Sequence, residues 1–261
     1  MELTDLKTIK SILQKHNKWA NKGMGQNFLI NQNSLSAIVE SANIKPSDHV
    51  IEIGPGLGVL TQELVKHAKK VTSLELDPTL FPILEETVPK EKYPNLEIIH
   101  QDALRFTPPS TPYKIVANIP YNITSPLISH FLHTENKAKS MTLLVQLEVA
   151  EKICLTEPKM TILSLQIALF GTATLVKKIA SSDFYPQPKV DSAILHIEVD
   201  PKVSDEEAIK ILKVAKRAFS QRRKKLSNTL PELKNSNQPI DLNRRPETLS
   251  IEEWRQILLH L

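Results

Sequence analysis

The sequence predicts an α/β protein with a doubly wound parallel sheet, followed by a small helical domain at the C-terminal end. Short apolar runs alternate with amphipathic stretches between residues 49 and 155, a pattern typical of parallel strands joined by crossover helices. Five of the six glycines lie in two short loops, at residues 23–25 and 54–58, where the backbone bends sharply or touches a ligand. Beyond Asp200 the apolar spacing is helical, so we place a domain boundary there.

The elements follow in order along the chain. Leu6, Ile9 and Leu13 share one face of a predicted N-terminal helix that carries lysines on its other side. A loop over residues 21–29 precedes a helix over residues 35–42. Buried strands are predicted at 49–53, 71–75, 96–100, 114–117 and 141–145, and crossover helices at 60–68, 79–86, 126–132 and 147–155. A helix at 163–168 then leads to strands 173–179 and 193–199, which we expect to pair antiparallel at the sheet edge.

Helix start signals organise the remainder of the chain. Ser204 and Glu207 form a predicted capping box that opens a helix continuing through Phe219. Ser250 and Glu253 open another helix in the same way. We therefore divide the chain into domains at residues 1–200 and 201–261.

The composition is that of an ordinary globular protein, with 41% hydrophobic and 24% charged residues. No apolar run approaches the roughly 20 residues that span a bilayer, and the N-terminus lacks the features of a secretory signal. We therefore expect no membrane partner. Cys154 is the single cysteine, so we expect a reducing, cytoplasmic location. We also expect no metal, because His130 and His133 share a predicted helix face but lack partner ligands nearby.

Positive charge is concentrated in one segment, although the net charge is only +4. Residues 213–225 contain seven basic side chains and no acidic one, and end in Arg222, Arg223, Lys224 and Lys225. A solvated helix face would explain such a run, but the lack of compensating carboxylates favours a polyanionic partner. We predict that the last four residues bind a polyanion such as RNA.

A glycine-rich turn follows the first predicted strand of the sheet. Gly54, Gly56 and Gly58 have the spacing G-x-G-x-G, which lets the backbone pass close to a nucleotide-like ligand. Glu75 ends the next strand, where a ribose diol needs a bidentate acceptor, and Asp102 follows the third strand, where an adenine amine would lie. Together they predict S-adenosylmethionine as the cosubstrate. Two alternatives remain. The two acids would serve only in loop solvation or helix capping, or the chain would be a nicotinamide-dependent dehydrogenase, which needs the spacing G-x-G-x-x-G.

The fourth predicted strand ends at a short motif, Asn118-Ile119-Pro120-Tyr121. The Asn118 side-chain oxygen and the Ile119 carbonyl can accept the two N–H groups of an aromatic amine, whose lone pair is otherwise conjugated into its ring. Pro120 fixes the backbone so that this carbonyl faces the pocket. Tyr121 offers a ring for stacking on an extruded base. The motif therefore predicts methyl transfer to an adenine amine by alignment, without a general base.

These motifs together resemble the ribosomal RNA adenine dimethylase family over nearly the whole chain. Its N-terminal cofactor motif resembles residues 25–29, which implies cofactor contacts from Gln26, Asn27 and Leu29, and from Asn118 in the catalytic motif. The segments at 52–58, 118–123, 146–150 and 218–226 also match family motifs in order. The family's base-stacking loop resembles residues 184–193, which implies that Phe184 packs on the target adenine. The fold implied is a Rossmann-like class I methyltransferase domain with a helical RNA-binding domain.

Two branches of this family differ in their RNA. One dimethylates two adjacent adenosines near the 3′ end of 16S rRNA, and the Erm branch modifies 23S rRNA. Gly-Pro-Gly-Leu-Gly at 54–58 and the basic run after Gln221 resemble the first branch, whereas Ile119 resembles the second. We therefore expect the 16S target within an immature small ribosomal subunit, and a monomeric enzyme. A noncatalytic RNA-binding assembly factor is the other alternative, although the Asn118–Tyr121 motif and Glu75 are intact.

Overall fold

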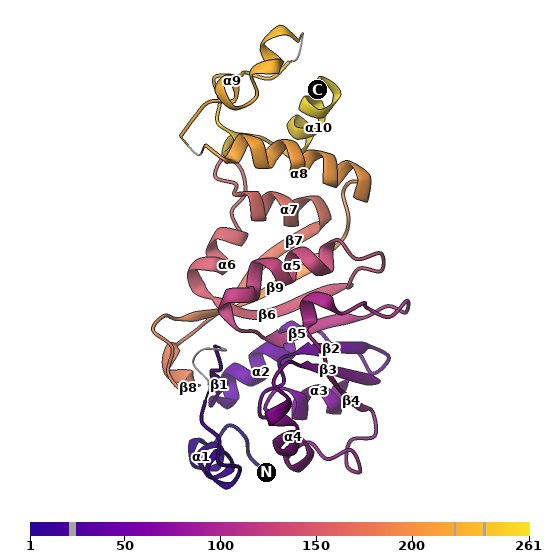
Figure 1. The fold of residues 1–261 in the computed structure, drawn as a ribbon, viewed down its shortest axis with the longest axis vertical. Helices are drawn as coiled ribbons and strands as arrows, with labels where there is room; N and C mark the ends of the chain where they lie inside the picture. Colours follow the sequence, from indigo (N-terminus) through magenta and orange to yellow (C-terminus); the bar gives the residue numbers. More distant parts are fainter. Residues whose placement is uncertain (21–24, 222, 237–238) are drawn as a thin grey trace. The chain divides into compact units, whose positions relative to one another are not determined.

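The structure is a computed structural model that describes residues 1–20, 25–221, 223–236 and 239–261 (Figure 1). The chain divides into two compact units. The first contains Met1–Ala150 and Thr174–Glu198, and the second contains Glu151–Ala173 and Val199–Leu261. Residues 151–173 group with the C-terminal part of the chain in this division, and the domains predicted at residues 1–200 and 201–261 stay a prediction. Among the described residues, no helix is both long and apolar enough to cross a membrane.

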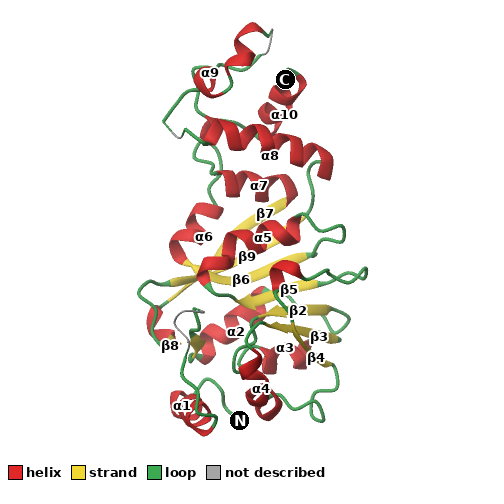
Figure 2. Cartoon of the chain, in the orientation of Figure 1, coloured by secondary structure: helices red, strands yellow, loops and turns green. Residues whose placement is uncertain are grey.

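The first unit is built on a seven-stranded sheet with the order β4-β3-β2-β5-β6-β9-β7 (Figure 2). The five strands from β2 to β6 form parallel pairs, and β9 pairs antiparallel with β6. Their bounds are β2 His49–Ile53, β3 Lys70–Glu75, β4 Leu96–His100, β5 Lys114–Asn118, β6 Ser140–Gln146, β7 Gly171–Ile179 and β9 Ser192–Val199. The predicted α/β fold is confirmed, and β7 and β9 are neighbours at the sheet edge as expected.

The central strands form because their apolar runs are buried on both faces. Val50, Ile51, Val116 and Ile115 are all 0% exposed, as expected for a parallel sheet covered by helices on both sides. The helices that alternate with these strands along the chain are α2 Gln32–Ser41, α3 Thr61–His67, α4 Phe81–Thr87, α5 Thr124–Leu132 and α6 Leu147–Ile153. The predicted strands agree with the observed ones to within two residues at either end. The helix predicted at 79–86 begins as a 3₁₀ turn, Pro78–Leu80.

The predicted N-terminal helix is present as α1, Leu6–Lys15. Its N-cap Asp5 accepts a hydrogen bond from the Thr8 N–H, which satisfies one of the free donors of the first turn. Ile9, Ile12 and Leu13 face the core and join one apolar cluster with Phe28 and Phe184. The helix is thus fixed to the sheet domain through its apolar face.

A second, two-stranded sheet was not predicted from the sequence. In it β1, Phe28–Leu29, pairs antiparallel with β8, Phe184–Tyr185 (Figure 1). Two residues are too short to produce an alternating pattern, so sequence periodicity could not reveal these strands. Their pairing joins the segment before the glycine turn to the loop before β9.

The second unit is helical where it extends beyond residue 200. Its helices are α7 Ile162–Phe170, α8 Asp205–Phe219, α9 Leu226–Thr229 and α10 Ile251–Leu259. The capping box of Ser250 and Glu253 is confirmed, and Ser204 caps α8 as predicted, but the Glu207 carboxylate binds Arg255 instead of closing a second box. Trp254 is 1% exposed and stacks on Phe219 at a centroid distance of 6.1 Å.

Candidate cofactor and catalytic site

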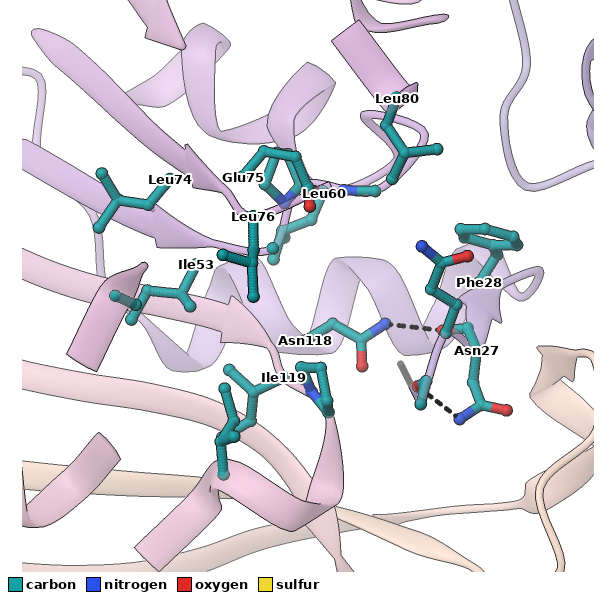
Figure 3. Close-up of a pocket in the computed structure, with 18 of the residues that line it drawn as sticks. Asn27, Phe28, Ile53, Leu60, Leu74, Glu75, Leu76, Leu80, Asn118 and Ile119 are labelled. Atoms are coloured by element: carbon teal, nitrogen blue, oxygen red, sulfur yellow. Dashed lines mark hydrogen bonds between the residues drawn. The ribbon is translucent and has the colours of Figure 1, made fainter. Parts of the chain in front are cut away.

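A cavity of about 320 Å³ lies at the carboxyl ends of strands β2, β3 and β5 in the first unit (Figure 3). Between β2 and β5 the strand order changes direction, and such a switch point is where open α/β sheets bind ligands. The cavity is lined by every residue predicted to bind the cofactor, together with Ile119, Pro120 and Tyr121. Five separate segments of the sequence therefore meet around one space.

The glycine turn forms one wall of the cavity. Gly54 and Gly56 have φ angles of +67° and +60°, in the left-handed region that disfavours other residues. A Cβ built on Gly54 would meet none of the described atoms within 4 Å, because the residue faces the open cavity. Gly58 serves a different purpose, since a Cβ there would lie 3.0 Å from Thr87 Oγ1 beside α4. The turn thus leaves space for a ligand at its start and packs against a helix at its end.

Glu75 lies beside this turn and is 6% exposed. Its Oε2 accepts from the Gly56 N–H at 3.2 Å, and its Oε1 accepts from the Asp77 N–H at 2.8 Å. Burial raises the pKa of this carboxyl, and the backbone donors oppose the rise. Each oxygen can accept a second hydrogen bond. The group therefore fits the predicted role, that of a bidentate acceptor for two ribose hydroxyls.

Apolar side chains next to Glu75 were not predicted as site residues. Leu76 lines the cavity and is 53% exposed, which is high for a leucine in a folded domain. The Phe28 ring also lines the cavity and lies 3.3 Å from the position of a Cβ on Gly56. Their pattern in the sequence is that of ordinary core residues, so only the fold reveals them as cavity walls.

Asp102 lines the same cavity at the end of β4. Its Oδ1 accepts from the Leu104 N–H at 2.9 Å and caps a 3₁₀ turn, Ala103–Arg105. The capping alternative from the sequence is therefore present in the structure, and the placement beside the cavity is also compatible with contact to an adenine amine. Its role in binding stays a prediction.

Asn118 ends β5, and its orientation is fixed by the N-terminal motif. Its Nδ2 donates to the Asn27 carbonyl at 3.1 Å, and Asn27 in turn donates from Nδ2 to the Gly25 carbonyl at 3.0 Å (Figure 3). A carbonyl can only accept, so the nitrogen of Asn118 must face Asn27 and the oxygen must face away from it. This leaves the Asn118 Oδ1 as an acceptor beside the cavity, next to the buried Ile119.

Tyr121 and Phe184 differ in accessibility. Tyr121 lines the cavity, and its hydroxyl is hydrogen-bonded to Ser192 Oγ at 2.7 Å, which holds the ring in place. Burial raises the pKa of this phenol. Phe184 is 2% exposed, pairs with Leu29, and is not among the described residues that line the cavity. Stacking of Phe184 on a base stays a prediction and requires the ring to leave its buried position.

The basic cluster predicted to bind RNA lies in the second unit. Arg223, Lys224 and Lys225 are exposed, and Lys225 Nζ donates to Asn243 Oδ1 at 3.1 Å. Arg222 lies outside the described residues.

A Rossmann-like sheet with a glycine turn and a buried acid at successive strand ends defines the fold of class I S-adenosylmethionine-dependent methyltransferases. The family model of the ribosomal RNA adenine dimethylases matches residues 17–260. This chain belongs to that family and is an rRNA adenine dimethyltransferase. It is 40% identical over 268 residues to Ribosomal RNA small subunit methyltransferase A of Dehalococcoides mccartyi, covering 96% of this chain and 91% of the relative. The resemblance stated from the sequence is thereby confirmed.

Solved structures show the same architecture. A dimethyladenosine transferase from Plasmodium falciparum superposes with a TM-score of 0.75 at 27% identity, over 88% of this chain and 96% of that one. The 23S rRNA methyltransferase ErmE superposes with a TM-score of 0.68, also at 27% identity, over 90% of this chain and 99% of that one. The predicted fold class is confirmed.

Proposed function

We propose that this enzyme transfers methyl groups from S-adenosylmethionine to the N6 amines of two adjacent adenosines near the 3′ end of 16S rRNA. The observation that carries the chemistry is the fixed orientation of Asn118, which presents an acceptor oxygen beside the cavity. The small-subunit target is supported by 40% identity to an enzyme named for that subunit, against 27% identity to ErmE. A 23S target is the alternative that this difference disfavours.

The cosubstrate would be held by the wall that contains the glycine turn. S-adenosylmethionine supplies an electrophilic methyl group on its sulfonium. The Glu75 carboxylate would accept from the ribose hydroxyls, and Leu76 would pack against the adenine ring. Gln26 and Asn27 would close over the methionine end, because they lie on the segment that also fixes Asn118.

The acceptor amine would be oriented by hydrogen bonds from its own protons. One N–H would donate to Asn118 Oδ1 and the other to the Ile119 carbonyl, so that the nitrogen lone pair points at the methyl group. The new N–C bond forms as the C–S bond breaks, and the nitrogen then releases one proton to water. After the first transfer one N–H remains, so a second methyl group can be added with a single acceptor.

We place this reaction in the cytoplasm, on an immature small ribosomal subunit, with the enzyme acting as a monomer. Exposed Arg223, Lys224 and Lys225 would hold RNA phosphates, together with Arg222. A base must leave its stack to reach the cavity, which costs a few kcal/mol and least where it is unpaired. Adenines in a hairpin loop are therefore the favoured substrate.

Incubation with undermethylated small subunits, followed by mass spectrometry of the RNA, tests this proposal. We expect dimethyladenosine at two adjacent positions near the 3′ end of 16S rRNA. Methylation confined to 23S rRNA would show that the target is the large-subunit RNA. RNA binding without methyl transfer would favour a noncatalytic assembly factor.

Asn118→Ala tests the mechanism. We expect the variant still to bind both substrates, and its methyl transfer rate to be lowered by at least about a hundredfold, because alignment supplies much of the barrier reduction. Tritium transfer from labelled cosubstrate measures the rate, and calorimetry measures the affinity. The pH dependence of the wild-type rate should show no catalytic base between about pH 6 and 9. An ionisation in that range that is traced to one residue of the cavity would contradict the mechanism.

A further inference from the structure

Trp19 is the most exposed large hydrophobic side chain that the structure describes, at 89%. The backbone around it is well anchored. The Lys18 N–H donates to the Leu13 carbonyl at 2.8 Å, and Ala20 packs against the apolar core of the first unit. The chain is therefore fixed on both sides of Trp19 while the indole ring extends into solvent. Trp side chains are highly buried on average, so an indole ring with this exposure is unusual.

The surroundings of Trp19 are strongly basic. Between Asp5 and Glu40 the sequence contains five lysines and no acidic residue. Lys15 is paired with Glu86 at 2.7 Å, whereas Lys18 and Lys7, whose charge acts on nearby Asp5, form no salt bridge within the described ranges. Lys10 Nζ lies 5.3 Å from the ring centroid of Tyr185, a residue of β8. A basic surface with an exposed aromatic ring is the combination that binds unpaired nucleic acid, through phosphates and base stacking.

This surface lies near the catalytic cavity. Trp19 is six residues before Gly25, which lines the cavity, so the two Cα atoms are at most about 22 Å apart. On the other side, the Tyr185 beneath Lys10 pairs with Phe28, which also lines the cavity. Figure 1 shows α1, β1 and β8 in the same part of the first unit. An RNA strand whose adenine enters the cavity could therefore pass over Trp19.

We infer that Trp19 stacks on an unpaired nucleobase of the substrate RNA, a few nucleotides from the target adenine, while Lys7, Lys10 and Lys18 bind the phosphates beside it. The occupant is single-stranded RNA, because duplex bases offer no free face for stacking. This inference rests on the proposed RNA substrate. It adds an RNA-binding surface in the first unit to the basic cluster proposed in the second.

The two tryptophans of the chain allow a direct test, because Trp254 is buried at 1% exposure. In a Trp254→Phe variant, Trp19 is the sole tryptophan. Titration with a small-subunit RNA hairpin that carries two adjacent loop adenines should quench its emission, with a midpoint equal to that of filter binding. The same titration of Trp19→Phe should produce no quenching of the remaining buried tryptophan.

Affinity provides the second readout. Trp19→Ala should weaken RNA binding by about five- to 150-fold, the range for losing one base–aromatic stack, and leave cosubstrate affinity and the salt dependence unchanged. Trp19→Phe should retain most of the affinity. Lys18→Ala should instead flatten the log–log salt slope by about 0.7. Val176→Ala, at another exposed apolar position in the first unit, is the matched control and should change none of these values.

The outcomes separate this inference from the proposed function. Normal RNA affinity of Trp19→Ala, or hairpin binding without quenching, overturns the inference while methylation of 16S rRNA continues to support the proposed function. Quenching and methylation with a 23S fragment alone would overturn the proposed target and support stacking by Trp19. Failure of the wild type to bind either RNA overturns both.

Discussion

Glu52 and Glu75 are buried carboxyl groups on adjacent strands, but only Glu75 lines the cavity. The difference follows from position in the strand, because Glu75 ends β3 while Glu52 lies within β2. Glu75 has backbone donors and access to a ligand. Glu52 has two hydroxyl donors, Thr61 Oγ1 at 2.7 Å and Ser73 Oγ at 2.6 Å, and its Oε1 has no partner among the described residues.

We predict that Glu75→Ala weakens S-adenosylmethionine binding by at least tenfold. The loss of a charged acceptor typically costs about 1.5–3 kcal/mol. Calorimetry measures the cosubstrate affinity, and filter binding should show unchanged RNA affinity. Glu75→Gln retains the shape and should also bind weakly. Glu97→Gln is the control, because Glu97 is an exposed residue of the edge strand β4 and is outside the lining residues. Unchanged affinity in both Glu75 variants would show that this carboxylate does not hold the ribose.

Glu52 gives the protein a pH-dependent stability. Burial raises the pKa of its carboxyl from 4.5 to about 7. An acid whose pKa is raised by folding stabilises the fold at pH values below the pKa that it has in the unfolded chain. This contribution is lost as the pH rises through the pKa of the folded state. Relative to Glu52→Gln, the wild type should therefore lose up to roughly 3 kcal/mol of unfolding free energy between pH 5 and 8. Urea unfolding of both proteins at several pH values measures this, and parallel pH profiles would contradict it.

At the scale of the elements, two glycines of the glycine turn have different roles, one beside the ligand cavity and one in packing against a helix. Gly54 and Gly58 both have positive φ, which costs a substituted residue about 1–2 kcal/mol. Gly54→Ala adds a methyl group in the open cavity, whereas Gly58→Ala forces it against Thr87 and Val88. We predict the larger stability loss for Gly58→Ala and the larger loss of cosubstrate affinity for Gly54→Ala. Urea unfolding and calorimetry on both variants would reveal the opposite ranking if this division of roles were wrong.

The elements also show what the sequence could predict. The buried strands and the glycine turn were identified because burial on both faces produces continuous apolar runs, and positive φ restricts a position to glycine. The pairing of Phe28 with Tyr185 could not be predicted, because two residues carry no periodicity. Nor could the exposure of Leu76, since an apolar residue after a strand has the same pattern whether it is buried or lines a cavity. The pattern around each single residue does not show that Gln26, Glu75 and Asn118 belong to one site. The order of the family motifs along the chain predicted this grouping.

At the scale of the whole molecule, cosubstrate binding and much of the RNA binding are assigned to different units. The cavity lies entirely in the first unit, and the exposed cluster of Arg223, Lys224 and Lys225 lies in the second. If the second unit binds phosphates without reading bases, charge removal there should affect RNA affinity alone.

We therefore predict that Arg223→Ala combined with Lys224→Ala weakens binding to all RNAs alike and flattens the log–log salt slope by about 1.4, because each single-stranded phosphate contact contributes about 0.7. Filter binding at several salt concentrations measures the slope, and calorimetry should give unchanged cosubstrate affinity. Lys210→Ala is the matched control, since Lys210 lies on α8 and is already paired with Glu206 at 2.5 Å. Affinity lost for the small-subunit hairpin alone, with an unchanged slope, would mean that these residues read the sequence or shape of the target instead of its charge.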